Sequence, residues 1–266
     1  MFELFELAFI QRALISGILV GATLSLIGVF VVLRKSAFFG DAVSHFTFTG
    51  IALGFLIGID PIIGAIFVAL IFSFGIIFIQ NHSSKQSLDS LIGIFFSGAA
   101  ALGIFIIGML KGYRPDLFQY LFGDIVAISQ NDVWFSLIVT IIAGVAIFIT
   151  WKQLFKITFN REIAHVSGLN VAFYDYLFIG LLAIVTAVSI KIVGIILVPA
   201  LLVIPAASSK NIATTFKSLL FYSVIIAIIS VIVGLISSFY LDTASGATIV
   251  LASIVIFVIT LFGRHK

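Results

Sequence analysis

"SLLFYSVIIAIISVIVGLIS", residues 218–237, contains no charged side chain, and neither does "VWFSLIVTIIAGVAIFIT", residues 133–150. An apolar run of about 18 or more residues is long enough for a helix to cross the ~30 Å hydrocarbon core of a bilayer. The strands of a membrane β-barrel would instead alternate apolar and polar residues over about ten positions. Since both runs are continuously apolar, we predict that they are transmembrane helices.

The whole chain has the composition of an integral membrane protein. Hydrophobic residues make up 62% of its 266 residues and charged residues only 9%, whereas soluble domains carry about 25% charged residues. We therefore predict an all-α polytopic membrane protein with eight to nine transmembrane helices. The expected spans are residues 13–33, 38–58, 61–80, 88–110, 133–151, 172–190, 193–209, 218–239 and 246–262.

The seventh of these spans decides whether the chain has eight or nine transmembrane helices. Its sequence, "KIVGIILVPALLVIPAASSK" at residues 191–210, contains Pro199 and Pro205 and is barely long enough to cross. Proline removes a backbone donor and clashes with the preceding turn of a helix. The segment is therefore either a kinked helix or a broken helix whose freed carbonyl groups line a cavity.

Basic residues recur on alternate connections between the expected spans, at Arg34, Lys35, Lys85, Lys152, Lys156, Arg161, Lys210, Lys217, Arg264 and Lys266. The positive-inside rule assigns connections rich in Lys and Arg to the cytoplasm. Since Arg34 and Lys35 follow the first expected span, we expect the N-terminus on the outer side of the membrane. The formal net charge of +3 is small and indicates no nucleic-acid partner.

Two absences from the sequence limit its chemistry. The chain has no cysteine, which excludes disulfides, thiolate metal sites and cysteine nucleophiles. A metal would therefore bind to histidine, carboxylate or carbonyl groups. The P-loop pattern G-x-x-x-x-G-K-[ST] does not occur, so ATP, if it drives this protein, binds to another chain.

The stretch "FFGDAVSHFTFTG", residues 38–50, places Asp41 and His45 four residues apart inside an expected span. Residues at that spacing share one face of a helix, and ionisable groups within a membrane mark ion or proton pathways or a buried partner. The spacing is compatible with a structural pair, a metal pathway or a proton relay. On another face, a ladder of small residues lets a second helix approach closely, at Gly50, Gly54 and Gly58.

The connection "KQLFKITFNREIAHVSGLN", residues 152–170, carries Glu162, Ala164 and Gly168 in the pattern E-x-A-x-x-x-G. The pattern predicts a short amphipathic helix that Gly168 ends. By itself it is compatible with an interfacial connector as well as with a docking element for another protein.

Several segments together resemble a known family. The chain is similar to the permease subunits of bacterial ABC transporters that import zinc, manganese or iron, and among these to the zinc-uptake permeases. The similar segments follow the family's order over nearly the whole chain and are "FFGDAVSHFTFTGIALG", "LDSLIGI", "RPDLFQYLFGDIVAIS", "REIAHVSGLN", "KIVGIILVPALLVIPAASS" and "YLDTASGATIVL".

The resemblance implies a single permease domain over residues 1–266, in the bacterial cytoplasmic (inner) membrane among lipid. It implies that Glu162, Ala164 and Gly168 belong to a coupling helix within residues 152–170, which docks on a cytoplasmic ATPase subunit. It places Asp41 and His45 on the metal path. In such a system an extracytoplasmic zinc-binding protein delivers Zn²⁺ as substrate, ATP binds to the partner subunit, and the permease is no enzyme and holds no permanent cofactor.

Coordination chemistry adds the expectation of a homodimer. Zinc prefers about four ligands, and one chain offers only Asp41 and His45 on this face. Two chains related by a two-fold axis, the commonest symmetric assembly, would supply four.

Two departures from the family pattern bear on these expectations. Thr49 precedes Gly50 where manganese-type members tend to have proline, which favours zinc. Phe159, Asn160 and Arg161 stand where Asp-Pro is frequent, so the docking contacts of the loop differ in detail.

Other functions remain as alternatives. A manganese or iron importer permease is compatible with the same ligands, since His and carboxylate serve all three metals, and a proton-coupled secondary carrier would need no ATPase. A membrane enzyme is disfavoured because no HExxH or Ser/His/Asp set is evident, and the four histidines are far apart in the sequence, at 45, 82, 165 and 265.

Overall fold

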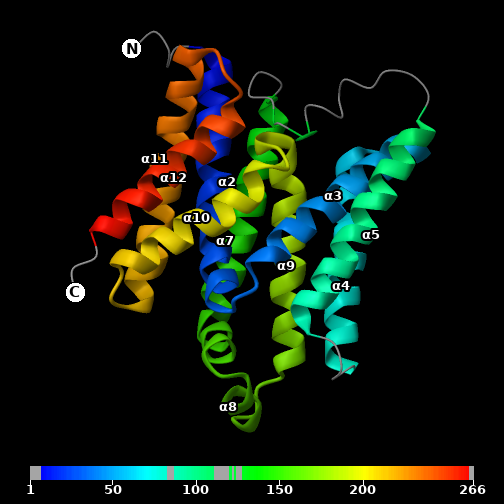
Figure 1. The fold of residues 1–266 in the computed structure, drawn as a ribbon, viewed down its shortest axis with the longest axis vertical. Coiled ribbons are helices and arrows are strands. Elements are labelled where there is room, and N and C mark those ends of the chain that lie inside the picture. The colour runs from blue at the N-terminus through cyan, green and yellow to red at the C-terminus, as the bar shows by residue number, and fades with distance from the viewer. Residues whose placement is uncertain (1–6, 83–86, 111–119, 122, 124–127, 264–266) are drawn as a thin grey trace.

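A computed structural model describes residues 7–82, 87–110, 120, 121, 123 and 128–263 of the chain, and Lys85, Arg264 and Lys266 lie outside that part. All regular structure in these ranges is α-helical (Figure 1). Eight of the helices are apolar and at least 18 residues long, which confirms the predicted class. The helices are α2 (Ala8–Leu33), α3 (Ala37–Ile57), α4 (Pro61–His82), α5 (Leu88–Met109), α7 (Gln130–Phe159), α8 (Arg161–Val166), α9 (Val171–Val193), α10 (Leu197–Ile212), α11 (Phe216–Leu241) and α12 (Ser245–Phe262).

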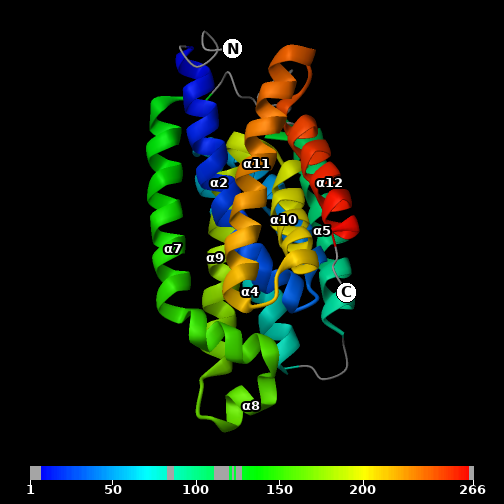
Figure 2. The same cartoon turned by 90° about the vertical axis from the view of Figure 1, so that its left-hand side faces the viewer.

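The proline-containing segment forms α10, a single helix of 16 residues with Pro205 inside it. At about 1.5 Å per residue it is about 24 Å long, shorter than the hydrocarbon core. Pro199 lies in the first turn, where no intrahelical donor is lost, and the chain breaks earlier, at Gly194 with φ 85°. Figures 1 and 2 show that α10 returns the chain from the end of α9 to the start of α11.

Helix α7 is longer than the predicted span. It runs for 30 residues, or about 45 Å. Lys152 and Lys156 therefore lie within the helix and not in the predicted loop. Figure 2 shows the lower end of α7 turning toward α8, which lies at one end of the molecule. The predicted connection 152–170 is therefore a helical extension followed by a separate short helix.

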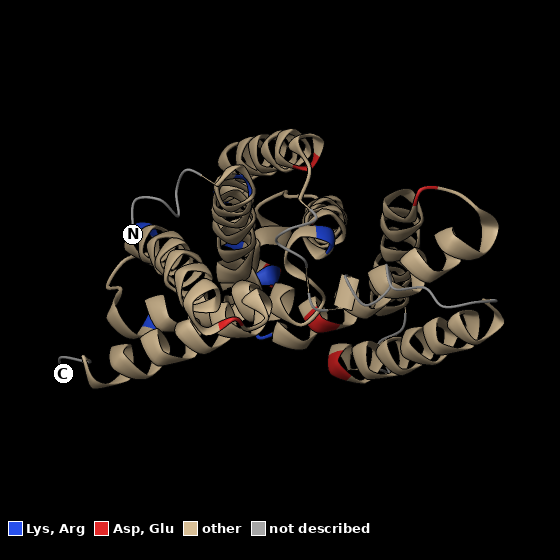
Figure 3. Cartoon of the chain, turned by 90° about the horizontal axis from the view of Figure 1, so that it is seen from above, with Lys and Arg blue, Asp and Glu red and all other residues tan. Residues whose placement is uncertain are grey.

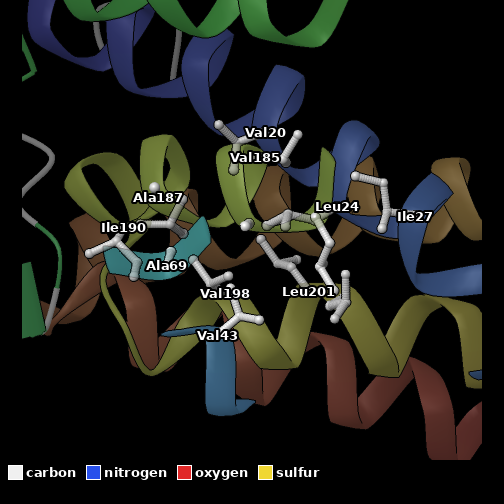
Figure 4. Packing of buried hydrophobic residues seen from close by; sticks show 14 of the residues in the cluster. Val20, Leu24, Ile27, Val43, Ala69, Val185, Ala187, Ile190, Val198 and Leu201 are labelled. Atoms are coloured by element: carbon white, nitrogen blue, oxygen red, sulfur yellow. The ribbon is translucent and has the colours of Figure 1, made fainter. Parts of the chain in front are cut away.

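Helix α9 is the centre of the bundle and contacts α2, α3, α4, α7, α8 and α10. On one side of it α3 packs with α4 and α5. On the other side α2 packs with α10 and α11, and α12 packs against these two helices. Figure 4 shows side chains of the core between them, with Leu24 and Ile27 from α2, Val198 and Leu201 from α10, and Val43 from α3. Seen from above, few Lys, Arg, Asp or Glu residues interrupt the helices (Figure 3). Apolar packing around α9 thus holds two groups of helices together.

Small residues allow the closest helix contacts. A Cβ atom on Gly50 would collide with the Gly64 carbonyl of α4, and one on Gly54 would lie 2.9 Å from Pro61 Cα. Gly28 of α2 likewise lies directly against the Leu202 carbonyl of α10. Close backbone approach of this kind is how membrane helices associate without a hydrophobic driving force between them.

Gly58 does not share the packing role that its spacing suggested. No atom lies within 4 Å of a Cβ atom built on it, and its φ of 76° ends α3 in the left-handed conformation. Glycine adopts that conformation without the steric cost of a Cβ atom. The ladder on α3 therefore consists of Gly50 and Gly54, with Gly58 as the cap.

We expect Gly50→Ala to lower the thermal unfolding midpoint of the detergent-solubilised permease. Overpacking a tight contact costs about 1–3 kcal/mol, and here the new methyl group meets backbone atoms of Gly64 and Ala65. Gly144→Ala is the matched control, since that glycine has no neighbour within 4 Å of its would-be Cβ. Equal midpoints for the two variants would show that the α3–α4 contact is not tight.

Candidate functional site

Asp41 and His45 lie on a stripe of α3 that the rest of the chain leaves uncovered. From Phe39 to Ala52, all residues are buried except Asp41, His45 and Phe48, which are partly exposed. Their spacing of four and three places them on one helix face. Packing with α4, α5, α9 and α10 covers the other faces of α3, so this stripe is the side from which α3 can be reached.

The two side chains have no polar partner within the described part of the chain. No hydrogen bond or ion pair of either is found there, whereas the neighbouring hydroxyl groups of Ser44 and Thr47 donate to carbonyls of their own helix, at 3.0 and 2.8 Å. An ionised carboxylate in a membrane helix is costly unless it is compensated. The ligand capacity of the pair is therefore free.

Helix α5 supports His45 from the side. The ring of Phe96 meets the imidazole edge to face, with the ring centroids 4.5 Å apart. One turn along, Thr49 Oγ1 lies 3.0 Å from the His45 carbonyl oxygen and 2.7 Å from the Ala99 carbonyl oxygen of α5. Ring packing and this hydroxyl group together fix α3 against α5 at the level of His45.

Within the described residues of one chain, no group of three or more His, Cys, Asp or Glu side chains is close enough together to hold a metal ion. One chain therefore does not complete a metal site there. Asp41 and His45 supply one carboxylate and one imidazole, and both are ordinary zinc ligands. A tetrahedral zinc ion would need two further ligands.

The residues of the E-x-A-x-x-x-G pattern have distinct places around α8. Glu162 is exposed in the first turn. Ala164 is 1% exposed and packs in a small cluster with Ile157 of α7 and Val171 of α9. The small side chain of Ala164 thus lets α8 lie close to the ends of both long helices.

Gly168 ends α8 in a Schellman motif. Its φ is 81°, its N–H donates to the His165 carbonyl at 3.0 Å, and the Leu169 N–H donates to the Ala164 carbonyl at 3.2 Å. At the other end the Asn160 side chain accepts from the Ile163 N–H at 3.0 Å, which is the N-cap role of asparagine. Both ends of this short helix are therefore fixed by local hydrogen bonds.

The tip formed by α8 carries apolar side chains that nothing in the described chain covers. Ile163 is 66% exposed and Val166 is 89% exposed, and Phe159 at the end of α7 is exposed as well. Figure 1 shows α8 at the lower extremity of the molecule, beyond the end of α4. Beside it is a pocket of ≈ 580 Å³, lined by Asn81, Arg161, His165, Gly168, Leu169, Asn170, Val171 and Ala172. Exposed apolar residues rimmed by polar groups mark a protein interaction site.

Ion pairs join both ends of α9 to neighbouring helices, and nothing in the sequence alone indicated them. Asp175 pairs with Arg34 and Arg161, and Lys191 Nζ lies 2.6 Å from Asp132 Oδ1 on α7. Burial lowers the pKa of Arg34, and the adjacent Asp175 carboxylate opposes that effect. The sequence signal for Asp175 was an acid within an apolar span.

Comparison with known proteins connects this architecture to a family. Residues 6–264 match the ABC 3 transport family. The chain is 35% identical to the high-affinity zinc uptake system membrane protein ZnuB of Haemophilus influenzae, over 99% of this chain and 100% of that protein. It is 38% identical to the manganese import system permease protein ScaB of Streptococcus gordonii, over 99% and 94%.

A solved structure shares the fold. The structure of PsaBC from Streptococcus pneumoniae in complex with Fab superposes with a TM-score of 0.87 at 36% identity, covering 97% of this chain and 93% of that one. The eight long apolar helices agree with the multi-pass architecture of these relatives. The chain therefore belongs to the ABC 3 transport family, as a multi-pass permease of the bacterial inner membrane.

Proposed function

We propose that this chain is the membrane-spanning permease subunit of an ATP-driven importer of divalent metal, with zinc as the ion carried. The observation that supports it most directly is the uncovered stripe of α3, where Asp41 and His45 have no polar partner in the described chain. Family membership supports transport as the activity, and the name of the Haemophilus influenzae relative supports zinc.

The metal path is completed by a second copy of the chain. Two Asp41 and two His45 side chains, facing each other across a two-fold axis, supply the four ligands that zinc prefers. Phe38 is 75% exposed and Phe48 is partly exposed on the same stripe, so apolar contacts flank the polar pair. Pairing also removes the carboxylates from lipid, where they would be costly.

The site must hold the ion only briefly. A closed tetrahedral cage of protein ligands behaves as a structural zinc site, and such a site would retain the ion. The carboxylates offset part of the dication's loss of hydration as it crosses, and the histidines give directional ligands. We therefore expect weak zinc binding by the isolated dimer, and the ion is a substrate and no resident cofactor.

Coupling to ATP takes place at α8. Glu162 with the exposed Ile163 and Val166 forms the contact for a cytoplasmic ATPase subunit. The basic residues at this end support a cytoplasmic location by the positive-inside rule. The chain has no P-loop of its own, so the ATPase binds the nucleotide. Residues 1–266 act as one permease unit, and an extracytoplasmic zinc-binding protein delivers the ion at the opposite end.

Manganese is the second candidate ion, because ScaB is 38% identical and is named for manganese import. Thr49 favours zinc: its hydroxyl group bonds to the carbonyl groups of His45 and Ala99, a contact that proline could not make. We expect a strain that lacks its own zinc and manganese importers, and expresses this permease with its partners, to regain zinc uptake but little manganese uptake. Uptake of ⁶⁵Zn and ⁵⁴Mn is measured side by side, and greater manganese uptake would assign the permease to manganese.

Removing either ligand should stop transport. We expect His45→Ala and Asp41→Asn each to lower the initial rate of metal uptake by at least about tenfold, the loss typical of residues that merely support a metal ligand. Ser44→Ala is the control, since that hydroxyl group bonds only to a carbonyl of its own helix. Membrane insertion and dimer yield are measured for all variants. Wild-type uptake in the double variant would remove the pair from the path.

Reversing the charge at α8 should separate the permease from its ATPase. We expect Glu162→Lys to reduce both co-purification of the ATPase and zinc uptake, because the exposed carboxylate lies within the proposed contact. Asp89→Lys is the matched control, an exposed acid in the first turn of α5. Normal association and normal uptake for Glu162→Lys would contradict the assignment of α8.

A further inference from the structure

Asp175, in the second turn of α9, is a buried carboxylate shared by two arginines. It is 3% exposed. Arg34 Nη1, at the end of α2, donates to Asp175 Oδ1 at 3.0 Å, and Arg161 Nη2, at the start of α8, lies 2.9 Å from Asp175 Oδ2. A buried carboxylate is costly unless it is paired and hydrogen-bonded, so this group keeps the ends of three helices together.

Each arginine also reaches one further helix. Arg34 Nε donates to Thr158 Oγ1 of α7 at 3.1 Å, and its guanidinium lies over the Phe178 ring, 4.5 Å from the centroid. Arg161 Nη2 donates to Asn81 Oδ1 near the end of α4 at 3.1 Å. Through these side chains Asp175 links α2, α4, α7, α8 and α9 at one end of the bundle.

The two arginine contacts differ in strength. The Arg34 side chain is 16% exposed and its contact with Asp175 has hydrogen-bond geometry. The Arg161 side chain is 49% exposed, and its ion pair with Oδ2 lacks that geometry. A partly hydrated ion pair is worth less than a buried one. The contact with α8 is therefore the one that can be released, while the contact with α2 is the fixed one.

Arg34 has a spare donor that can take over. Its Nη2 atom is buried and has no acceptor among the described residues. If Arg161 withdraws, a small rotation lets Arg34 bind both carboxylate oxygens in the bidentate arrangement that guanidinium groups favour. Asp175 can thus remain paired in two states, with or without the arginine of α8.

The position of Asp175 relates α8 to the metal ligands. Among the described helices α8 packs mainly against α7 and α9. Its residue Arg161 reaches Asn81 of α4 directly and Arg34 of α2 through Asp175. Helix α4 packs on α3, which carries Asp41 and His45, whereas α2 belongs to the group with α10, α11 and α12. A displacement of Arg161 therefore acts where the two groups of helices meet.

We propose that Asp175 is a positioning residue that transmits displacement of α8 to the helices lining the metal path, by exchanging Arg161 for the spare donor of Arg34. This inference rests on the proposed docking of an ATPase on α8. Asp175 is buried and paired with two arginines, on a different helix from Asp41 and His45, so it acts through its neighbours and its role is to make hydrolysis productive. Loss of the link leaves the ATPase bound and active but separates hydrolysis from metal import.

The test measures zinc imported per ATP hydrolysed, in proteoliposomes that contain the permease with its co-purified ATPase and zinc-binding protein. Arg161→Gln removes the charge from α8 but leaves the Arg34–Asp175 pair, so the protein retains its buried ion pair. Because Arg161 borders the proposed ATPase contact, the amount of bound ATPase is measured for every variant and only assembled complexes are compared. We expect the zinc-to-ATP ratio of assembled complexes to fall at least about fivefold below wild type, the lower range of coupling between two sites. Asp175→Asn should act in the same direction, and Arg161→Lys, which keeps the charge, should restore part of the ratio.

Lys191→Gln is the matched control. It breaks the ion pair with Asp132 at the other end of the same helix, without touching α8. An unchanged ratio in Arg161→Gln would overturn the proposal, and so would an equal fall in Lys191→Gln, because that result would assign the effect to any lost ion pair of α9. A wild-type complex without ATP-driven zinc uptake would overturn the proposed function, and this inference with it.

Discussion

The hydrocarbon core of a membrane contains no water to pair with backbone amide and carbonyl groups, and this constraint determines the rest of the structure. Each crossing segment must satisfy its backbone internally, so the segments are helices. Apolar side chains gain nothing by leaving lipid for one another, and the helices associate through close backbone contacts. Gly50 against Gly64, and Gly28 against the Leu202 carbonyl, are contacts of this kind. Charged groups are then restricted to the helix ends, except where function retains them.

Asp41 and His45 are the exception within α3. The other faces of the helix are covered by its neighbours, and the tight contact with α4 determines which face remains uncovered. The glycines thus have an indirect role in the proposed metal path, because they orient the pair. His45 gains further support from Phe96 and Thr49, which hold the helix beside α5. An uncovered acid in a membrane helix is stable only with a partner, and the proposed second chain and passing dication would both meet that need.

Helix α9 contacts both helices to which we assign a function, α3 and α8. Ion pairs fix both of its ends, with Asp175 near α8 and Lys191 near the start of α7. Its apolar middle forms the core between the two groups of helices. The proposed transmission requires α9 to move as a unit, and ion pairs at both of its ends favour such motion. The short α8, capped by Asn160 and Gly168, is rigid enough to deliver such a change.

The sequence by itself determined the features that depend on neighbouring residues. Uncharged runs predicted the helices, and the E-x-A-x-x-x-G pattern predicted a helix stop at Gly168, because a left-handed residue is a local property of the chain. The positions of Asp41 and His45 on one face followed from helix geometry alone. Only the tertiary structure decided which face of α3 is uncovered, and that Gly50 and Gly54 meet a neighbouring helix while Gly58 does not. The structure also showed that the chain breaks at Gly194 and not at a proline. Arg34 and Asp175 are 141 residues apart, and nothing local marks either as the other's partner. Their pairing depends on how α2 packs against α9, which is set by contacts summed over the whole bundle.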